Sequence, residues 1–212
     1  MKIALIGASG FIGSALLYEA LERGHNLSAV VTRPEKLTPH AQVQVLACDV
    51  LDTQKLATML RGHDAILSAF SGHAQPNVQE YYEQGIRSII NASKEAGVSR
   101  LLVVGGAGSL EVAPGKLFLD TDTFPKEYQP TAQGAYTALR LLREEKSLDW
   151  TMLSPAAEIF PGDKTGVFRL GTDQLLQDTK GQSRISTADY AVAMLNELEQ
   201  PAHIRMRFTV AY

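Results

Sequence analysis

The sequence begins Met1-Lys2-Ile3-Ala4-Leu5-Ile6-Gly7-Ala8-Ser9-Gly10-Phe11-Ile12-Gly13, and this stretch decides the fold. The unbroken apolar run from Ile3 to Ile6 is typical of a strand buried on both faces. A strand, a glycine-rich turn and a helix in this order indicate a nucleotide-binding turn, because the helix N-terminus attracts phosphate. An ordinary strand-to-helix turn is the alternative. We expect the nucleotide to contact Gly7, Ser9, Gly10, Phe11, Ile12 and Gly13.

The three glycines have different predicted tasks. Gly7 permits the tight turn after the strand, and Gly10 lets the backbone approach a pyrophosphate. Gly13 allows the helix to pack closely against the strand.

Length and composition favour one domain over residues 1–212. The net charge of −3 argues against nucleic acid as a partner, and no apolar run is long enough to span a membrane. The first strand begins at once, so we expect no signal peptide. Cys48 is the only cysteine, which excludes an internal disulfide and fits a cytoplasmic protein. We read Cys48 as a buried apolar residue rather than a nucleophile. The five histidines are scattered without metal-ligand spacing, so no metal site is expected.

Strands and helices alternate along most of the chain. This alternation predicts an α/β fold, a doubly wound and mostly parallel sheet between two layers of helices. The expected strands are 27–32, 43–48, 65–70, 101–104 and 150–153, with an edge strand at 204–210. A short helix capped by Asp52 or Thr53 is expected to stop at Gly62, and longer ones are expected at about 78–96 and 132–146. Ser186 with Asp189 predicts a capping box that opens the last helix.

Two irregular segments are expected to form a small lobe on the substrate side. They span about 106–130 and 155–186, and the second includes a possible hairpin within 160–181. Long irregular segments in compact domains are usually functional. Phe118, Phe124 and Tyr128 could form either an aromatic lid or a small cluster under a loop. His73, in the loop 71–77, could contact substrate or lie on the surface.

Arg33 indicates which nucleotide is bound. Enzymes specific for NAD place a carboxylate about 20 residues after the glycines to bind the ribose 2′-hydroxyl. Here that position is Arg33, whose guanidinium suits a 2′-phosphate, so we expect NADP(H) in preference to NAD(H). A solvated surface charge is the alternative. Asp49, just after the third strand, is expected either to bind the adenine amino group or to cap a turn.

Five stretches beyond the glycine turn carry a further resemblance. They are Cys48-Asp49-Val50, Val104-Gly105-Gly106-Ala107-Gly108-Ser109, Ser154-Pro155-Ala156-Ala157, Gly181-Gln182-Ser183-Arg184-Ile185-Ser186 and Arg207-Phe208-Thr209-Val210. With them, the chain resembles the atypical short-chain dehydrogenase/reductases over nearly its whole length. It looks closest to their NAD(P)H-binding branch, whose members are labelled NADH-flavin reductases or epimerase/dehydratase-like proteins.

The resemblance implies a three-layer Rossmann fold with the cofactor across the carboxyl ends of the strands. Ser109 matches the family's catalytic serine position. The further positions implied to contact the cofactor are Val50, Ala69, Phe70, Ser71, Gly106, Pro155, Ala156 and Ala157.

The sequence departs from the wider family because no Tyr-x-x-x-Lys stands in the expected helix. The nearest pair is Tyr136 and Arg140, which share a helix face. Tyr136 is either a proton donor or a residue that shapes the pocket, and Arg140 either favours its phenolate or contacts phosphate or substrate.

The sequence therefore predicts an NADPH-dependent oxidoreductase that transfers hydride to a flavin- or quinone-like acceptor. We expect Ser109 and Tyr136 to orient the substrate. A sensor that binds NADP without turnover, similar to the NmrA-like proteins, is the first alternative, and a sugar-nucleotide epimerase or dehydratase is the second. The expected partner is a small molecule, and the chain is a monomer or homodimer.

Overall fold

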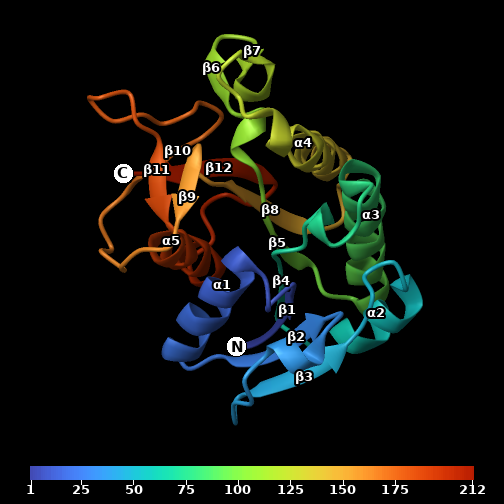
Figure 1. The fold of residues 1–212 in the computed structure, drawn as a ribbon. Coiled ribbons are helices and arrows are strands. Elements are labelled where there is room, and N and C mark those ends of the chain that lie inside the picture. The colour runs from blue at the N-terminus through green and yellow to red at the C-terminus, as the bar shows by residue number, and fades with distance from the viewer.

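An eight-stranded sheet forms the centre of the computed structural model, which describes residues 1–212 apart from the side chain of Ala74 (Figure 1). The strand order is β10-β12-β8-β5-β4-β1-β2-β3. Within this sheet, as far as the structure describes it, the β10–β12 pair is antiparallel and every other pair is parallel. The strands are β1 (Lys2–Ile6), β2 (Asn26–Val31), β3 (Val43–Ala47), β4 (Ala65–Ser68), β5 (Arg100–Val104), β8 (Asp149–Ser154), β10 (Arg169–Gly171) and β12 (Met206–Ala211). The predicted mostly parallel α/β fold is confirmed.

Helices cover both faces of this sheet. Alternate residues of β1 point to opposite faces, so Ile3 and Leu5 join one core while Ala4 and Ile6 join the other. The first core includes α1 and α5, and the second includes α2, α3 and α4, as Figure 1 shows. The helices are α1 (Phe11–Glu22), α2 (Thr53–Leu60), α3 (Val78–Ala96), α4 (Gln129–Glu144) and α5 (Thr187–Glu199).

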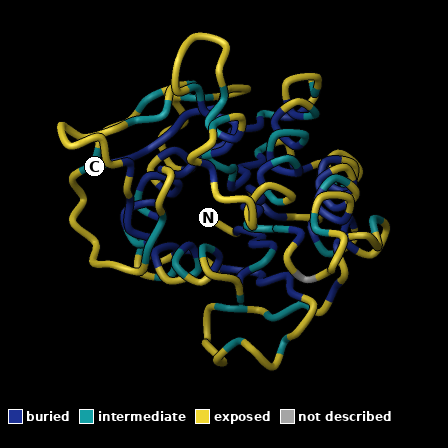
Figure 2. The backbone as a smooth tube through the Cα atoms, turned by 45° about the horizontal axis from the view of Figure 1, so that its top comes forward, coloured by how far each residue is buried: buried dark blue, intermediate teal, exposed yellow. Residues whose placement is uncertain are grey.

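Burial follows these layers. Figure 2 shows the buried backbone concentrated in the strands and the inner helix faces, with long exposed connections around them. The loops that follow the parallel strands meet at one edge of the sheet, where they are free to differ without disturbing the core. Functional residues are therefore expected at this edge.

Three predicted strands end earlier than expected. The second stops at Val31, the third at Ala47 and the fourth at Ser68, so Thr32, Cys48 and residues 69–70 belong to the loops of the carboxyl edge. Cys48 is buried, as predicted.

The prediction for the last strand is wrong in one respect. Residues 206–211 pair with β8 on one side and with β10 on the other, so they do not form the edge of the sheet. The strand β10 is therefore no part of a hairpin within 160–181. A separate parallel pair, β9 (Glu158–Phe160) with β11 (Arg184–Ser186), frames the C-terminal lobe.

The segment 105–130 has more structure than its sequence indicates. It contains the antiparallel pair β6 (Glu111–Ala113) and β7 (Lys116–Leu117), together with three short 3₁₀ helices. The helix α4 begins at Gln129, three residues before the predicted start, with Pro130 in its first turn where proline is tolerated.

Asp189 ties the lobe to the start of α5. The Ser186 hydroxyl accepts the N–H of Asp189 at 3.0 Å, as the predicted capping box requires. The Asp189 carboxylate, however, accepts hydrogen bonds from Thr165 (N–H and hydroxyl), Gly166 N–H and the Tyr212 hydroxyl. Burial by itself would raise the pKa of Asp189, but hydrogen bonds from Thr165 and Tyr212 outweigh it and the pKa is lowered.

Candidate functional site

The glycine turn after β1 is held by backbone contacts. Gly7 adopts a φ of +80°, and its N–H donates to the Val30 carbonyl at 2.9 Å. A methyl group on Gly7 would lie 2.8 Å from the Ala69 carbonyl oxygen, and one on Gly13 would collide with the Gly7 carbonyl oxygen. Gly10 is less constrained, because its Cβ would stand 3.2 Å from the same oxygen. The backbone therefore requires glycine at positions 7 and 13.

The N-terminus of α1 fits a dinucleotide phosphate. In the part of the chain that the structure describes, no side chain caps this helix, whose N-cap is Gly10. The N–H groups of a helix's first turn have no partner inside the helix and carry a partial positive charge. Because the glycines keep side chains away from this turn, an anion can approach it closely.

A cleft of about 850 Å³ opens beside this turn, at the carboxyl edge of the sheet. It lies where the strand order reverses between β1 and β4, which is the usual binding crevice of open α/β sheets. Nine of the predicted site residues line it: Phe11, Ile12, Ala69, Phe70, Ser71, Gly106, Pro155, Ala156 and Ala157.

The other predicted cofactor residues follow the same edge toward β3. The Arg33 side chain is exposed just after β2 and makes no hydrogen bond or ion pair with any described residue, while its backbone carbonyl accepts the Lys36 N–H at 3.2 Å. Asp49 accepts the Leu51 N–H at 3.0 Å and the Tyr81 hydroxyl at 3.3 Å, so it closes a turn after β3. Val50 is buried beside it. Gly7, Ser9 and Gly10 lie in the turn between β1 and α1, and Gly13 lies in the first turn of α1.

Ser109 lies behind the cleft wall. It is only 3% exposed, and Arg207 of β12 donates to its hydroxyl at 3.2 Å. Among the described residues the cleft lining from this loop ends at Gly108. The structure thus ties the predicted catalytic serine to the core of the sheet.

Tyr136 and Arg140 also lie away from the cleft. Tyr136 is half-buried and packs against a small apolar cluster that contains Leu119 and Phe124. The residues of α4 that line the cleft are Thr131, Ala132 and Ala135, within the part of the chain described. Arg140 is exposed, further along the helix. The alternative in which Tyr136 packs is therefore the one that its position fits.

Aromatic side chains form the wall on the lobe side. Phe118, Phe124 and Tyr128 all line the cleft, and the rings of the two phenylalanines meet edge to face at 5.1 Å. Phe118 and Phe124 also belong to the apolar cluster beneath the loop. The cluster interpretation is therefore confirmed for Phe118 and Phe124, and the aromatic lid stays a prediction.

Tyr82 of α3 is a cleft residue that the sequence does not mark as a site residue. Its side chain lines the cleft, and its hydroxyl donates to the Val104 carbonyl at 3.4 Å. Burial raises the pKa of Tyr82, so the phenol stays protonated. Gly85, one turn later, leaves room for the Phe70 ring, which would collide with a methyl group there. The sequence signal for this close contact is a glycine at position 85 within an otherwise helical pattern.

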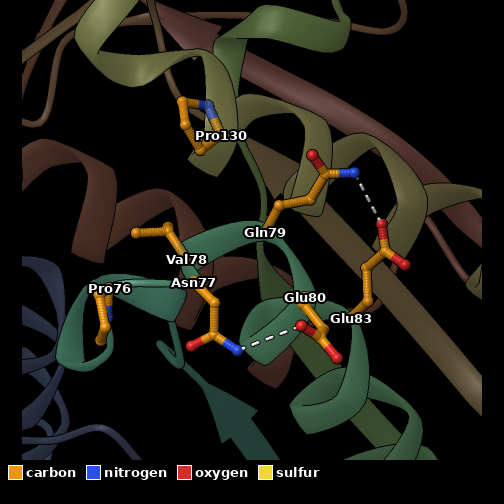
Figure 3. A pocket seen from close by; sticks show the side chains of 7 residues that line it. All are labelled: Pro76, Asn77, Val78, Gln79, Glu80, Glu83 and Pro130. Atoms are coloured by element: carbon orange, nitrogen blue, oxygen red, sulfur yellow. Dashed lines mark hydrogen bonds between the residues drawn. The ribbon is translucent and has the colours of Figure 1, made fainter.

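A smaller hollow of about 360 Å³ lies outside the cleft (Figure 3). Pro130 of α4 faces the first turn of α3, where Glu83 accepts from Gln79 and Glu80 from Asn77. The hollow shows that the loop before α3 and the start of α4 lie close together.

No group of three potential metal ligands lies together among the described side chains. Within that same part of the chain, no helix is both long and apolar enough to cross a bilayer.

Comparison with known proteins agrees with this geometry. Residues 7–198 match the model of a family described as NAD(P)H-binding. The uncharacterized protein YwnB of Bacillus subtilis is 43% identical over 99% of this chain and 98% of its own. A protein of Bacteroides thetaiotaomicron, provisionally described as an epimerase, is 43% identical with a TM-score of 0.93, over 100% of this chain and 96% of that one.

A third relative carries a different provisional description. This protein of Streptococcus pneumoniae, described provisionally as an NADH-flavin reductase, is 34% identical with a TM-score of 0.86, over 100% and 99% of the two chains. The resemblance to the NAD(P)H-binding branch of the atypical short-chain dehydrogenase/reductases is thereby confirmed. With its uncapped helix start, its glycine turn and its cleft at the strand reversal, the chain belongs to the NAD(P)H-binding family of Rossmann-fold proteins.

Proposed function

We propose that this protein is an NADPH-dependent oxidoreductase that reduces a flavin- or quinone-like acceptor. The observation that carries the proposal is the cleft itself, whose volume of about 850 Å³ leaves room for a flat ring system beside a nicotinamide. Its walls are mainly apolar and include Phe118 and Phe124 on one side and Phe11 on the other. Flat aromatic ligands favour such walls. The provisional description of the Streptococcus relative as an NADH-flavin reductase points the same way.

The residues that would hold the cofactor are those of the glycine turn, Arg33, Asp49, Val50 and the loop 69–71. When bound, the nicotinamide supplies the hydride. Arg33 suits the extra phosphate of NADPH, because it is exposed at the carboxyl end of β2 and presents a planar set of donors.

The loop 155–157 has a fixed shape that suits a positioning role. The Ala157 N–H donates to the Ser183 hydroxyl at 3.1 Å, and the Glu158 N–H donates to the Ser183 carbonyl at 3.0 Å. A rigid edge at Pro155–Ala157 would hold the nicotinamide carboxamide in one orientation. In hydride transfer the protein contributes mainly this positioning and the exclusion of water.

Turnover tests the proposal directly. Purified protein is mixed with NADPH and, separately, with flavin mononucleotide, riboflavin and soluble quinones, and absorbance of the reduced nicotinamide is followed. We expect oxidation that saturates with at least one acceptor. Tight NADPH binding without turnover on any of them would contradict the proposal.

A sensor that binds NADP without turnover is the second candidate. The position of Ser109 and Tyr136 favours it, because neither side chain lines the cleft among the described residues. Their predicted catalytic roles stay predictions, which Ser109→Ala and Tyr136→Phe would test by the change in turnover. Sugar epimerisation or dehydration receives less support, because those reactions need an acid or base at the substrate hydroxyl.

The remaining expectations concern the cell and the assembly. We expect a cytoplasmic protein, since its only cysteine is a buried thiol. We also expect a monomer or homodimer, which sedimentation at several concentrations would distinguish.

A further inference from the structure

We propose that Ser71, His73 and Thr131 form a hydrogen-bonded chain that binds the oxygen atom of an aromatic acceptor in both its oxidised and its reduced form. The inference rests on the proposed function and names the feature of the acceptor that the cleft recognises. All three residues line the cleft. His73 lies 3.1 Å from the Ser71 hydroxyl through Nδ1 and 3.0 Å from the Thr131 hydroxyl through Nε2.

The chain of three joins two sides of the cleft. Ser71 and His73 belong to the loop between β4 and α3, whereas Thr131 lies in the first turn of α4, 58 residues from His73. Figure 3 shows neighbouring residues of these two segments around one hollow, with Pro130 lying above Val78 and Gln79. The imidazole is exposed, so a ligand in the cleft can reach it and the hydroxyls beside it.

Several other polar side chains of the cleft already have protein partners. Arg184 and Glu158 form an ion pair at 2.8 Å, and the guanidinium also covers the Phe160 ring. The Ser183 hydroxyl accepts from Ala157, and the Tyr82 hydroxyl donates to Val104. The Ser71–His73–Thr131 chain is therefore a polar group of the cleft that keeps capacity for a ligand, since each hydroxyl has one donor and two acceptor positions.

The polarity of this chain can reverse. A neutral imidazole has one N–H donor and one acceptor nitrogen, and a hydroxyl can either donate or accept. When His73 donates to Ser71, the Ser71 hydroxyl is free to donate to a ligand carbonyl. When His73 accepts from Ser71, that oxygen is left to accept from a ligand hydroxyl. A quinone carbonyl and the hydroxyl of the reduced ring place these opposite demands on one site.

Two probes of equal shape and charge test the inference. Anthraquinone-2-sulfonate carries two carbonyl oxygens, and anthracene-2-sulfonate lacks them. Binding of each to the full chain is measured by calorimetry for the wild type, His73→Phe and Ser71→Ala. We expect the variants to weaken binding of the quinone about tenfold, as loss of a hydrogen bond predicts, and to change binding of the hydrocarbon less than twofold. The reduced anthraquinone, kept under dithionite without oxygen, should lose the same factor.

His40→Phe is the matched control, because His40 is an exposed histidine outside the cleft lining. A second variant, His73→Asn, keeps an amide that can reach Ser71 and should recover most of the quinone affinity. Thermal unfolding of each variant separates a binding defect from a folding defect.

The outcomes separate this inference from the proposed function. Equal weakening of both probes, or unchanged quinone affinity in His73→Phe and Ser71→Ala, would overturn the inference even if the wild type oxidises NADPH with quinones. Selective loss of quinone binding supports it, also where NADPH turnover is absent and only the proposed reductase activity fails. Weakening confined to the oxidised probe would overturn the claim that both forms are bound.

Discussion

The two sides of the cleft are built in different ways. On one side, the glycine turn of residues 7–13 consists of neighbours in sequence, and its shape depends on backbone atoms. On the other side, residues 105–128 and 155–184 reach the cleft through contacts that span the chain, such as that between Arg207 and Ser109. The first side has no room for a methyl group at Gly7 or Gly13, whereas the second depends on particular side chains.

This difference explains why the cofactor is easier to infer than the acceptor. In Rossmann-fold proteins that bind NAD(P), the cofactor places the same pyrophosphate at the same kind of glycine turn. The shape of that turn is therefore set by backbone geometry. The acceptor wall has no common ligand to conform to, and its residues can change with the substrate. Substitutions on the two sides of the cleft should therefore have different effects on stability and on ligand binding.

The largest effect is expected at Gly13. In Gly13→Ala the new methyl group meets the Gly7 carbonyl, which cannot move without opening the turn. We expect the free energy of unfolding to fall by about 3 kcal/mol, at the upper end of overpacking effects, and NADPH binding to weaken. Urea unfolding and nucleotide fluorescence measure both. Gly10→Ala is the control and should cost less than about 1 kcal/mol, because its Cβ has more room. A Gly13→Ala protein as stable as the wild type would show that the turn is softer than described.

The next effect is expected at Asp189 on the lobe side. Asp189→Asn replaces an acceptor-only carboxylate and leaves the part-buried donors of Thr165 and Gly166 without a full set of partners. We expect a loss of about 2.5 kcal/mol at neutral pH. The folded pKa of Asp189 lies below its unfolded value of 3.8, so its stabilisation is complete above that value and disappears as pH falls through the folded pKa.

Urea unfolding at neutral pH and at about pH 3 checks this, because the difference between the wild type and Asp189→Asn should shrink in acid. Asp122→Asn, at an exposed position, should have no comparable effect. A difference that is the same at both pH values would show that the charge of Asp189 is not what stabilises the lobe.

Arg33 tests nucleotide preference on the turn side. In Arg33→Asp we expect the ratio of NADPH to NADH affinity to fall about 30-fold, or about 2 kcal/mol, because a carboxylate repels the 2′-phosphate and can accept from a ribose hydroxyl. Titration with both nucleotides gives the ratio. Arg87→Asp, an exposed change on α3, should leave it unaltered. An unchanged ratio in Arg33→Asp would show that Arg33 is a solvated surface charge that does not contact the 2′-phosphate.

Phe118 gives the smallest effect and the most selective one. Phe118→Ala removes one ring of the edge-to-face pair and part of the apolar wall. We expect the KM for a quinone acceptor to rise about tenfold while the Kd for NADPH stays the same. Steady-state kinetics and nucleotide titration separate the two constants. Tyr18→Ala, at an exposed position on α1, is the control. Equal loss for nucleotide and acceptor would mean that the two sides of the cleft do not act independently.

The same difference sets how much of the site the sequence reveals. Apolar runs and helical stripes predict the parallel sheet, its two helical layers and the turn, since these patterns act over neighbouring residues. Nine predicted residues line the cleft because strand ends of a parallel sheet must meet at one edge. The pair β6–β7 and the 3₁₀ helices of 105–130 have no periodicity, and local patterns cannot detect them.

The family resemblance does not reveal the surroundings of the Ser109 and Tyr136 side chains. Each occupies its expected position along the chain, but contacts from distant segments set the side-chain surroundings. Arg207, 98 residues away, fixes Ser109, and the cluster around Leu119 and Phe124 receives Tyr136. Such contacts depend on tertiary packing, which a single sequence does not display.

Gly85 has a consequence for engineering. The helix α3 supports the Phe70 ring from the side away from the cleft, and the space left by a missing methyl group lets that ring occupy its place. A designer could therefore reset the width of the cleft from outside it. Phe70→Leu would widen the cleft for a bulkier acceptor, whereas Gly85→Ala would displace the Phe70 ring toward the cleft and narrow it, and neither change touches the glycine turn.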